Sequence, residues 1–146
     1  MQFHILSEGR EKADPTAPLV ADYVSRIAKF SPIADSVVRP GAKTGLISKS
    51  QQIIAKGFLP IALDERGREY TSKGFSRALT QWMTRSPGGL LFIIGGAEGL
   101  PDEIRQLAQS TIALSQMTFP HRFARLMLTE QIYRALCIQK NIPYHK

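Results

Sequence analysis

Five strand-like segments alternate with five helix-like segments along this 146-residue chain, and this order limits the fold more than any other feature. Apolar runs typical of strands cover residues 2–6, 35–39, 58–64, 89–94 and 111–116. Regular alternation of this kind is typical of an α/β domain with a mainly parallel sheet. The length fits one domain, and we find no internal repeat or linker. We therefore predict a single domain over residues 1–146.

Segments with helical periodicity fill the intervals between the predicted strands. They cover residues 14–30, 46–56, 72–85, 102–110 and 122–141. Asp14 or Thr16 is placed to cap the first helix, and Gly57 to end the second. Two segments are predicted to be irregular: "PGAKTG", residues 40–45, as a basic loop, and "ERGREY", residues 65–70, as a polar turn.

The turns after three of the predicted strands are candidates for a ligand site. Ligands of open parallel sheets bind in the crevice beyond the carboxyl ends of the strands. The turns that occupy such positions here follow Leu63, Ile94 and Gln116. We therefore expect the functional residues at these three turns.

The chain is basic, with 19 Lys and Arg residues against 12 Asp and Glu residues, a net charge of +7 and a pI near 9.9. This balance is typical of proteins that bind nucleic acid, although a solvated basic surface has the same composition. No apolar run approaches the roughly 20 residues needed to cross a bilayer. The segment "MQFHILSEGR" has neither a basic leader nor a long apolar stretch, so we predict no signal peptide and a cytoplasmic location.

The turn "IGGAEG", residues 94–99, joins the most apolar strand to a predicted helix, where glycines often hold a phosphate-bearing cofactor. Its spacing is not the G-x-G-x-x-G of dinucleotide folds, and the chain has no P-loop. Asp102 and Glu103, in the first turn of the next helix, would repel a pyrophosphate. A neutral or cationic adenosine ligand such as S-adenosylmethionine meets no such repulsion. The alternative is a tight turn whose glycines only permit positive φ.

Four motifs, of which this turn is the first, occur in a fixed order. The others are "LSQMTFPH" at residues 114–121, "EQIYRA" at residues 130–135 and a terminal "YHK". With "LDERGR" at residues 63–68, they make the whole chain resemble the ribosomal large subunit methyltransferase H family of the SPOUT superfamily.

This resemblance implies both a fold and a reaction. The expected fold is an α/β sheet with a C-terminal trefoil knot, in a homodimer that binds S-adenosylmethionine in the knot. The expected reaction is methylation of N3 of a pseudouridine in 23S rRNA, at position 1915 in helix 69. The expected partner is 23S rRNA within the assembled ribosome, and no membrane is expected. Whether the substrate is free rRNA or the whole ribosome stays open.

The resemblance places the cofactor contacts on the three turns that the sheet argument selects. They are Leu63, Gly95, Leu114, Ser115, Gln116, Met117, Thr118 and Phe119. Backbone groups there can hold an adenine edge, and the apolar side chains can pack on its faces. For Leu63, Leu114 and Phe119 the alternative is an ordinary core position.

Tyr144 and His145, in the terminal motif, are the predicted catalytic residues. Methyl transfer requires in-line placement of donor and nucleophile and departure of the N3 proton. Tyr144 is suited to stack on the base, and His145 to accept the proton. The alternative for both is a frayed tail. The identity of the general base stays open.

Other polar residues near these motifs are candidates for binding roles. We expect His121 to order its loop or to contact RNA phosphate. Arg125 and Arg134 are expected to hold a phosphate or a carboxylate. Glu130 is equally suited to pair with Arg134 four residues later. Possible RNA contacts, each alternatively a solvated charge, are Lys43, Lys49, Arg66 and Arg68.

The remaining residues of chemical interest are expected to be structural. They are His4, Trp82 and the lone Cys137, which allows no intrachain disulfide. The three histidines have no metal-ligand spacing, so we predict no metal site.

Two rival functions are consistent with an α/β fold. The first is a catalytically idle ribosome-binding protein with the same architecture. The second is a small-molecule enzyme that uses a nicotinamide cofactor, and the missing G-x-G-x-x-G counts against it.

Overall fold

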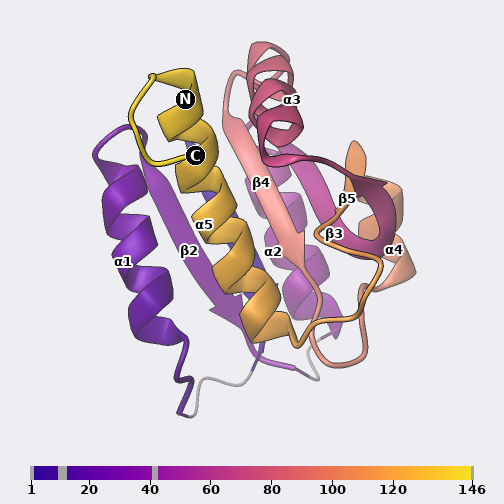
Figure 1. The fold of residues 1–146 in the computed structure, drawn as a ribbon. Helices are drawn as coiled ribbons and strands as arrows, with labels where there is room; N and C mark the ends of the chain where they lie inside the picture. Colours follow the sequence, from indigo (N-terminus) through magenta and orange to yellow (C-terminus); the bar gives the residue numbers. More distant parts are fainter. Residues whose placement is uncertain (1, 10–12, 41–42, 146) are drawn as a thin grey trace.

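The predicted α/β fold with a parallel sheet is confirmed by the computed structural model, which describes residues 2–9, 13–40 and 43–145 (Figure 1). The strands are β1 (Phe3–Glu8), β2 (Ile33–Val38), β3 (Phe58–Glu69), β4 (Gly89–Ile94) and β5 (Ser110–Ala113). They form one sheet in the order β2-β1-β4-β3-β5, and every pairing between them is parallel.

Helices cover both faces of this sheet. They are α1 (Ala17–Ala28), α2 (Lys43–Ile54), α3 (Ser72–Thr84), α4 (Asp102–Leu107) and α5 (His121–Gln139). Helix α5 packs between α1 and α3 on one face, and α2 and α4 lie on the other (Figure 1). The molecule therefore has three layers, with the sheet in the middle.

Strand β4 belongs to both apolar cores because alternate side chains of a strand point to opposite faces. Leu90, Phe92 and Ile94 join the core beneath α1, α3 and α5. Leu91 and Ile93 join the core beneath α2 and α4. A strand buried on both faces has a continuous apolar sequence rather than an alternating one, which explains the run "GLLFII".

Strand β3 extends beyond the predicted end at residue 64 to Glu69, so the predicted turn over residues 65–70 is wrong at residues 65–69. Leu63 pairs with Ile112, the next residues leave the ladder, and Arg68 pairs with Ile112 again. The unpaired segment is stabilised by a hydrogen bond that the Asp64 carboxylate accepts from the backbone N–H of Arg66 at 3.0 Å. This local Asx-type turn shifts the register of β3 against β5 while the strand keeps its direction, because the pairing is parallel on both sides of it.

Strand β5 is shorter than predicted, because it ends at Ala113 rather than at Gln116. Beyond it the Ser115 hydroxyl accepts a hydrogen bond from the Met117 N–H at 3.1 Å, which turns the chain out of the sheet. Helix α4 is also shorter, because the Gln109 N–H bonds to the Pro60 carbonyl of β3 and leads into β5.

Helix ends follow local signals only in part. Thr16 occupies the N-cap of α1 but caps nothing, since its own N–H and hydroxyl donate to Asp14. Helix α2 begins at Lys43, so the loop predicted over residues 40–45 is too long, and positions 41 and 42 lie outside the described residues. Gly57, at φ +93°, follows the end of α2 as predicted.

The residues expected to be structural are confirmed as such. Trp82 and Cys137 are buried on α3 and α5. His4 forms a hydrogen bond between its Nε2 and the Ser36 hydroxyl at 3.0 Å, which joins β1 to β2. Within the described ranges no helix is long and apolar enough to span a bilayer.

Gly67 is the residue that allows the outward loop of β3 to lie against β5. A Cβ at this position would stand 2.6 Å from the carbonyl carbon of Ile112 and 2.8 Å from its nitrogen. We expect Gly67→Ala to lower the free energy of unfolding by about 2 kcal/mol, because backbone must move to make room. Urea unfolding followed by the fluorescence of Trp82 measures this, and a change below about 0.5 kcal/mol would contradict the packing.

Candidate functional site

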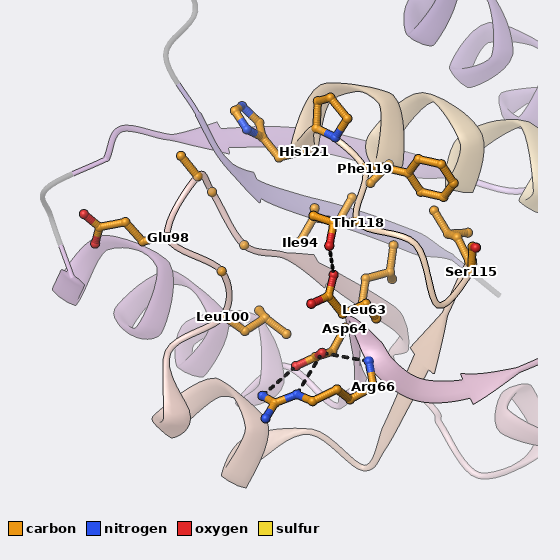
Figure 2. A pocket seen from close by; sticks show the side chains of 18 of the residues that line it. Leu63, Asp64, Arg66, Ile94, Glu98, Leu100, Ser115, Thr118, Phe119 and His121 are labelled. Carbon is orange, nitrogen blue, oxygen red and sulfur yellow. Dashed lines mark hydrogen bonds and ion pairs between the residues drawn. The ribbon is translucent and has the colours of Figure 1, made fainter.

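A cavity of about 820 Å³ opens at the carboxyl ends of β3, β4 and β5 (Figure 2). Three segments line most of it: residues 63–66 within β3, where its pairing with β5 is interrupted, residues 94–100 after β4, and most of residues 114–121 before and at the start of α5. These segments contain or adjoin the three turns at which the sequence predicts a ligand site. The fold brings them together around one cavity.

Seven of the eight predicted cofactor-binding residues line this cavity. They are Leu63, Gly95, Leu114, Ser115, Met117, Thr118 and Phe119. Gln116, the eighth, is exposed and does not line the cavity.

The glycine turn forms one wall by close backbone packing. A Cβ on Gly95 would stand 2.6 Å from the carbonyl carbon and oxygen of Gly99 and 2.8 Å from the nitrogen of Leu100. Gly99 has φ +80° and donates its N–H to the Gly96 carbonyl at 3.0 Å. Gly95 is therefore required for space, whereas Gly99 is required for its left-handed backbone.

Asp64 connects two walls of the cavity. Its side chain is only 8% exposed, and its carboxylate accepts a hydrogen bond from Arg105 Nε of α4 at 2.8 Å, besides the backbone N–H of Arg66 (Figure 2). Burial alone would raise the pKa of Asp64, but hydrogen bonds from Arg66 and Arg105 outweigh it and lower the pKa to about 2. The carboxylate is therefore ionised at neutral pH and holds α4 against β3.

The loop from Leu114 to Pro120 forms the wall facing the glycine turn. The Thr118 hydroxyl donates to the Glu65 carboxylate across the cavity (Figure 2). Met117 is 73% exposed, and Leu114 packs against the core. The loop thus presents apolar side chains and backbone groups to the space.

His121 directly follows this loop and is the first residue of α5. Burial, followed by the nearby Arg122, lowers the pKa of His121, so its ring is neutral at pH 7. Its Nε2 is buried and has no hydrogen-bond partner among the described residues. The same nitrogen lies 2.9 Å from where a Cβ on Gly9 would be. The ring therefore packs against the end of β1, and its predicted role in ordering the loop stays a prediction.

Tyr144 and His145, the two predicted catalytic residues, do not line the cavity of their own chain. The Tyr144 hydroxyl donates to Glu130 at 3.0 Å, and Arg134 lies 3.2 Å from His145 Nδ1. Glu130 follows His121 by nine residues, which is about 14 Å along a helix axis. Figure 1 shows the carboxyl terminus near the end of the sheet opposite the tips of the strand arrows.

The predicted pairing of Glu130 with Arg134 is confirmed, with Arg134 Nε 2.9 Å from Glu130 Oε1. Arg125 likewise holds a carboxylate, that of Asp35 on β2, at 3.0 Å from its Nε.

The predicted RNA-contacting residues that the structure describes in full lie on β3 and α2. Arg66 is 71% exposed and pairs with Asp64, and Arg68 lies over the Tyr70 ring at 4.8 Å. Lys49 is exposed on α2, and the side chain of Lys43 lies outside the described residues. No group of three or more potential metal ligands occurs in the part of the chain that the structure describes.

The sequence did not predict the two side-chain contacts that link the walls of the cavity. Asp64 and Arg105 are 41 residues apart, and Glu65 and Thr118 are 53 apart. The available signal was the pair of acidic residues placed directly after an apolar strand end in "LDERGR".

Asp64→Asn should reduce stability at neutral pH but not in strong acid. The folded-state pKa is depressed, so this stabilisation is present above the unfolded-state pKa of about 3.9 and is lost as pH falls toward about 2. At pH 7 we expect the free energy of unfolding to be about 2 kcal/mol lower in Asp64→Asn than in the unsubstituted protein. This difference should disappear between pH 4 and pH 2.

The measurement is urea unfolding across this pH range. Asp22→Asn is the control, because Asp22 forms an exposed pair with Arg26 on α1 and should cost less than about 0.5 kcal/mol. A pH-independent gap for Asp64→Asn would contradict the assignment.

Comparison with known proteins identifies the family of the chain. Residues 1–145 match a family model described as "Predicted SPOUT methyltransferase". Relatives named "Ribosomal RNA large subunit methyltransferase H" include one from Roseobacter denitrificans, 34% identical over 100% of this chain and 99% of its own length. Another, from Oleidesulfovibrio alaskensis, is 36% identical over 97% of this chain and 96% of its own length.

A solved structure supports the fold on independent grounds. A probable methylase family protein from Haemophilus influenzae Rd KW20 superposes with a TM-score of 0.59 at 11% sequence identity, covering 99% of this chain and 70% of that chain. At this identity the likeness shows the fold alone. The family match over nearly the whole chain, together with relatives above 30% identity, shows that this protein is a member of the SPOUT methyltransferase family.

Proposed function

We propose that this protein is a single-domain, S-adenosylmethionine-dependent methyltransferase of 23S rRNA. Its proposed product is N3-methylpseudouridine in helix 69, formed on the assembled ribosome in the cytoplasm. The observation that carries the proposal is the cavity, which gathers three family motifs at the carboxyl ends of adjacent strands. The names of the relatives support rRNA as the substrate class.

The charges around the cavity fit a cationic cofactor better than a phosphate-bearing one. The two arginines in its lining, Arg66 and Arg105, are both bound to Asp64. Two further carboxylates, Glu65 and Glu98, also line the space. A pyrophosphate would meet these acids, whereas a sulfonium and an amino group would be attracted to them.

The apolar lining suits an adenine ring. Leu63 at the end of β3 and Leu114 and Phe119 of the facing loop are available to pack on its faces. Backbone N–H and C=O groups of the same segments are available for its edge. Gln116 is removed from the proposed contacts because its side chain lies outside the cavity.

Binding both reactants in line is the main task of the chain in this reaction. When bound, S-adenosylmethionine would supply a methyl group on a sulfonium that can leave as a neutral thioether. The N3 proton of the base would pass to water as N3 takes up the methyl group. The walls formed by the glycine turn and the loop before α5 would exclude water from the methyl group.

A homodimer is part of the proposal, because the catalytic tail lies far from the cavity of its own chain. Tyr144 and His145 can act only if they reach the cavity of a second copy. Exposed apolar side chains favour such an association: Met117 in the cavity lining and Phe123 and Met127 on α5 are 73%, 52% and 39% exposed. The trefoil knot is likewise proposed from the family resemblance.

The catalytically idle ribosome-binding protein remains the second candidate, favoured by the separation of Tyr144 and His145 from the cavity. It predicts ribosome binding without cofactor affinity. The nicotinamide enzyme is not retained, since the chain belongs to a methyltransferase family.

Gly95→Ala should weaken cofactor binding at least about tenfold, because the added Cβ overlaps the backbone of Gly99 and deforms the wall. Gly99→Ala is the matched control in the same turn. A Cβ there meets nothing within 4 Å, so the cost is about 1 kcal/mol of stability with a small change in affinity. Titration calorimetry with S-adenosylmethionine compares them, and equal affinities would contradict the proposed site.

Ribosomes from a strain that lacks this gene should lack one methyl group on a pseudouridine of helix 69. Mass spectrometry of 23S rRNA fragments detects the missing mass. Incubating those ribosomes with purified protein and S-adenosylmethionine should restore it. An unchanged modification state in the deletion strain would refute the proposed substrate.

A further inference from the structure

Five side chains at the carboxyl-terminal end of the molecule form one hydrogen-bonded network, which we call the tail network: Tyr23, Glu130, Arg134, Tyr144 and His145. It joins α1, α5 and the tail. Four of its members carry groups that could accept a proton from a substrate, namely one carboxylate, two phenols and one imidazole. The contacts of each group determine what it can do.

Both oxygens of the Glu130 carboxylate already accept hydrogen bonds. Its Oε1 accepts hydrogen bonds from Arg134 Nε at 2.9 Å, from the other Arg134 nitrogen at 2.6 Å and from the Tyr144 hydroxyl at 3.0 Å. Its Oε2 accepts from the Gln131 amide at 2.9 Å. Both oxygens of this carboxylate are therefore engaged by neighbouring donors, and Glu130 is the shared acceptor of the tail network.

Tyr144 is held as a neutral phenol. Burial, then the hydrogen bonds with Tyr23 and Glu130, raise the pKa of Tyr144 well above its ordinary value. Because Tyr144 donates to Glu130, the Tyr23 hydroxyl, 3.2 Å away, is the donor to Tyr144. The phenol therefore has no role as a base at neutral pH.

His145 is held in one tautomer by Arg134. A guanidinium carries only donors and is never deprotonated in proteins, so Nδ1 of His145, 3.2 Å from the Arg134 guanidinium, must be the acceptor. The lone pair of Nδ1 is then occupied, and the ring proton is on Nε2. The free edge of the ring presents an N–H donor rather than a basic nitrogen.

We propose that His145 donates a hydrogen bond from Nε2–H to a carbonyl oxygen of the target base, and that Arg134 is the positioning residue that fixes this tautomer. This inference rests on the proposed function. N3 of a pseudouridine lies between two carbonyl groups, and negative charge develops on their oxygens as the N3 proton leaves to water. A donor already aimed at such an oxygen stabilises that charge and favours attack on the methyl group. The earlier expectation that His145 accepts the proton is replaced by this role.

Two substitutions at His145 separate a donor from a base. His145→Gln keeps an N–H donor at nearly the position of Nε2 but cannot accept a proton at neutral pH, whereas His145→Ala removes both. We expect the alanine variant to transfer methyl groups to ribosomes about a hundredfold more slowly, and the glutamine variant to stay within about tenfold of the unsubstituted protein. Equal loss in both variants would overturn the donor role.

A spectroscopic measurement tests the tautomer without any methyl transfer. In protein carrying ¹⁵N-histidine, at a pH where free imidazole is neutral, Nδ1 of His145 should resonate as an unprotonated nitrogen and Nε2 as a protonated one. His145→Ala identifies these signals among those of His4 and His121.

Arg134→Ala should move both nitrogens of His145 toward the averaged positions of a ring that exchanges tautomers. Arg77→Ala, which removes an exposed arginine on α3, should leave them unchanged. A protonated Nδ1 in the unsubstituted protein, or no response to Arg134→Ala, would overturn the proposal. Because this readout needs neither cofactor nor ribosome, it remains decisive even if the proposed reaction is wrong.

Discussion

The pairing of β4 with β1 on one side and β3 on the other is the constraint on which the rest of the structure depends. Phe92 lies opposite Ile5 on one neighbour and Ile61 on the other, and all three side chains are fully buried in one core. The opposite face of β4 forms the core beneath α2 and α4. Because β4 ends at Ile94, the glycine turn emerges between the ends of its neighbours, where the cavity opens.

The element order and the place of the site could be predicted from sequence because both depend on local pattern. A continuous apolar run predicts a central strand, and carboxyl ends of parallel strands share one edge of the sheet. The extent of β3 could not be predicted in this way. Arg68 and Glu69 are polar and follow an Asx turn, and they are in a strand only because Ile112 and Ala113 pair with them. Such long-range pairing leaves no periodic signal.

The site was predictable as a set of backbone segments but not as a set of contacts. Leu63 on β3 and Gly95 directly after β4 lie side by side because these strands pair, so their position follows from strand order. The ion pair between Asp64 and Arg105 depends instead on where α4 docks. The separation of Tyr144 from the cavity was also invisible in the sequence, because it depends on the tail folding back onto α5.

The charge distribution links these observations to function. The chain carries a net charge of +7, yet the two arginines in the cavity lining pair with Asp64, and Glu65 and Glu98 line the same space. An acidic cavity in a basic protein suits a cationic small molecule and a polyanionic partner at the same time. The charges of the cavity lining and the net charge of the whole chain thus suit the two proposed ligands separately.

A crystal structure of the protein with S-adenosylmethionine tests the central claim most directly. We expect the cofactor between Leu63, Gly95 and Phe119, with the sulfonium facing the cavity mouth. We also expect the Tyr144–His145 segment of a second copy beside that mouth. S-adenosylmethionine bound outside the cavity would contradict the proposed site. S-adenosylmethionine bound in the cavity with no Tyr144–His145 segment of a second copy beside it would contradict the proposed dimer.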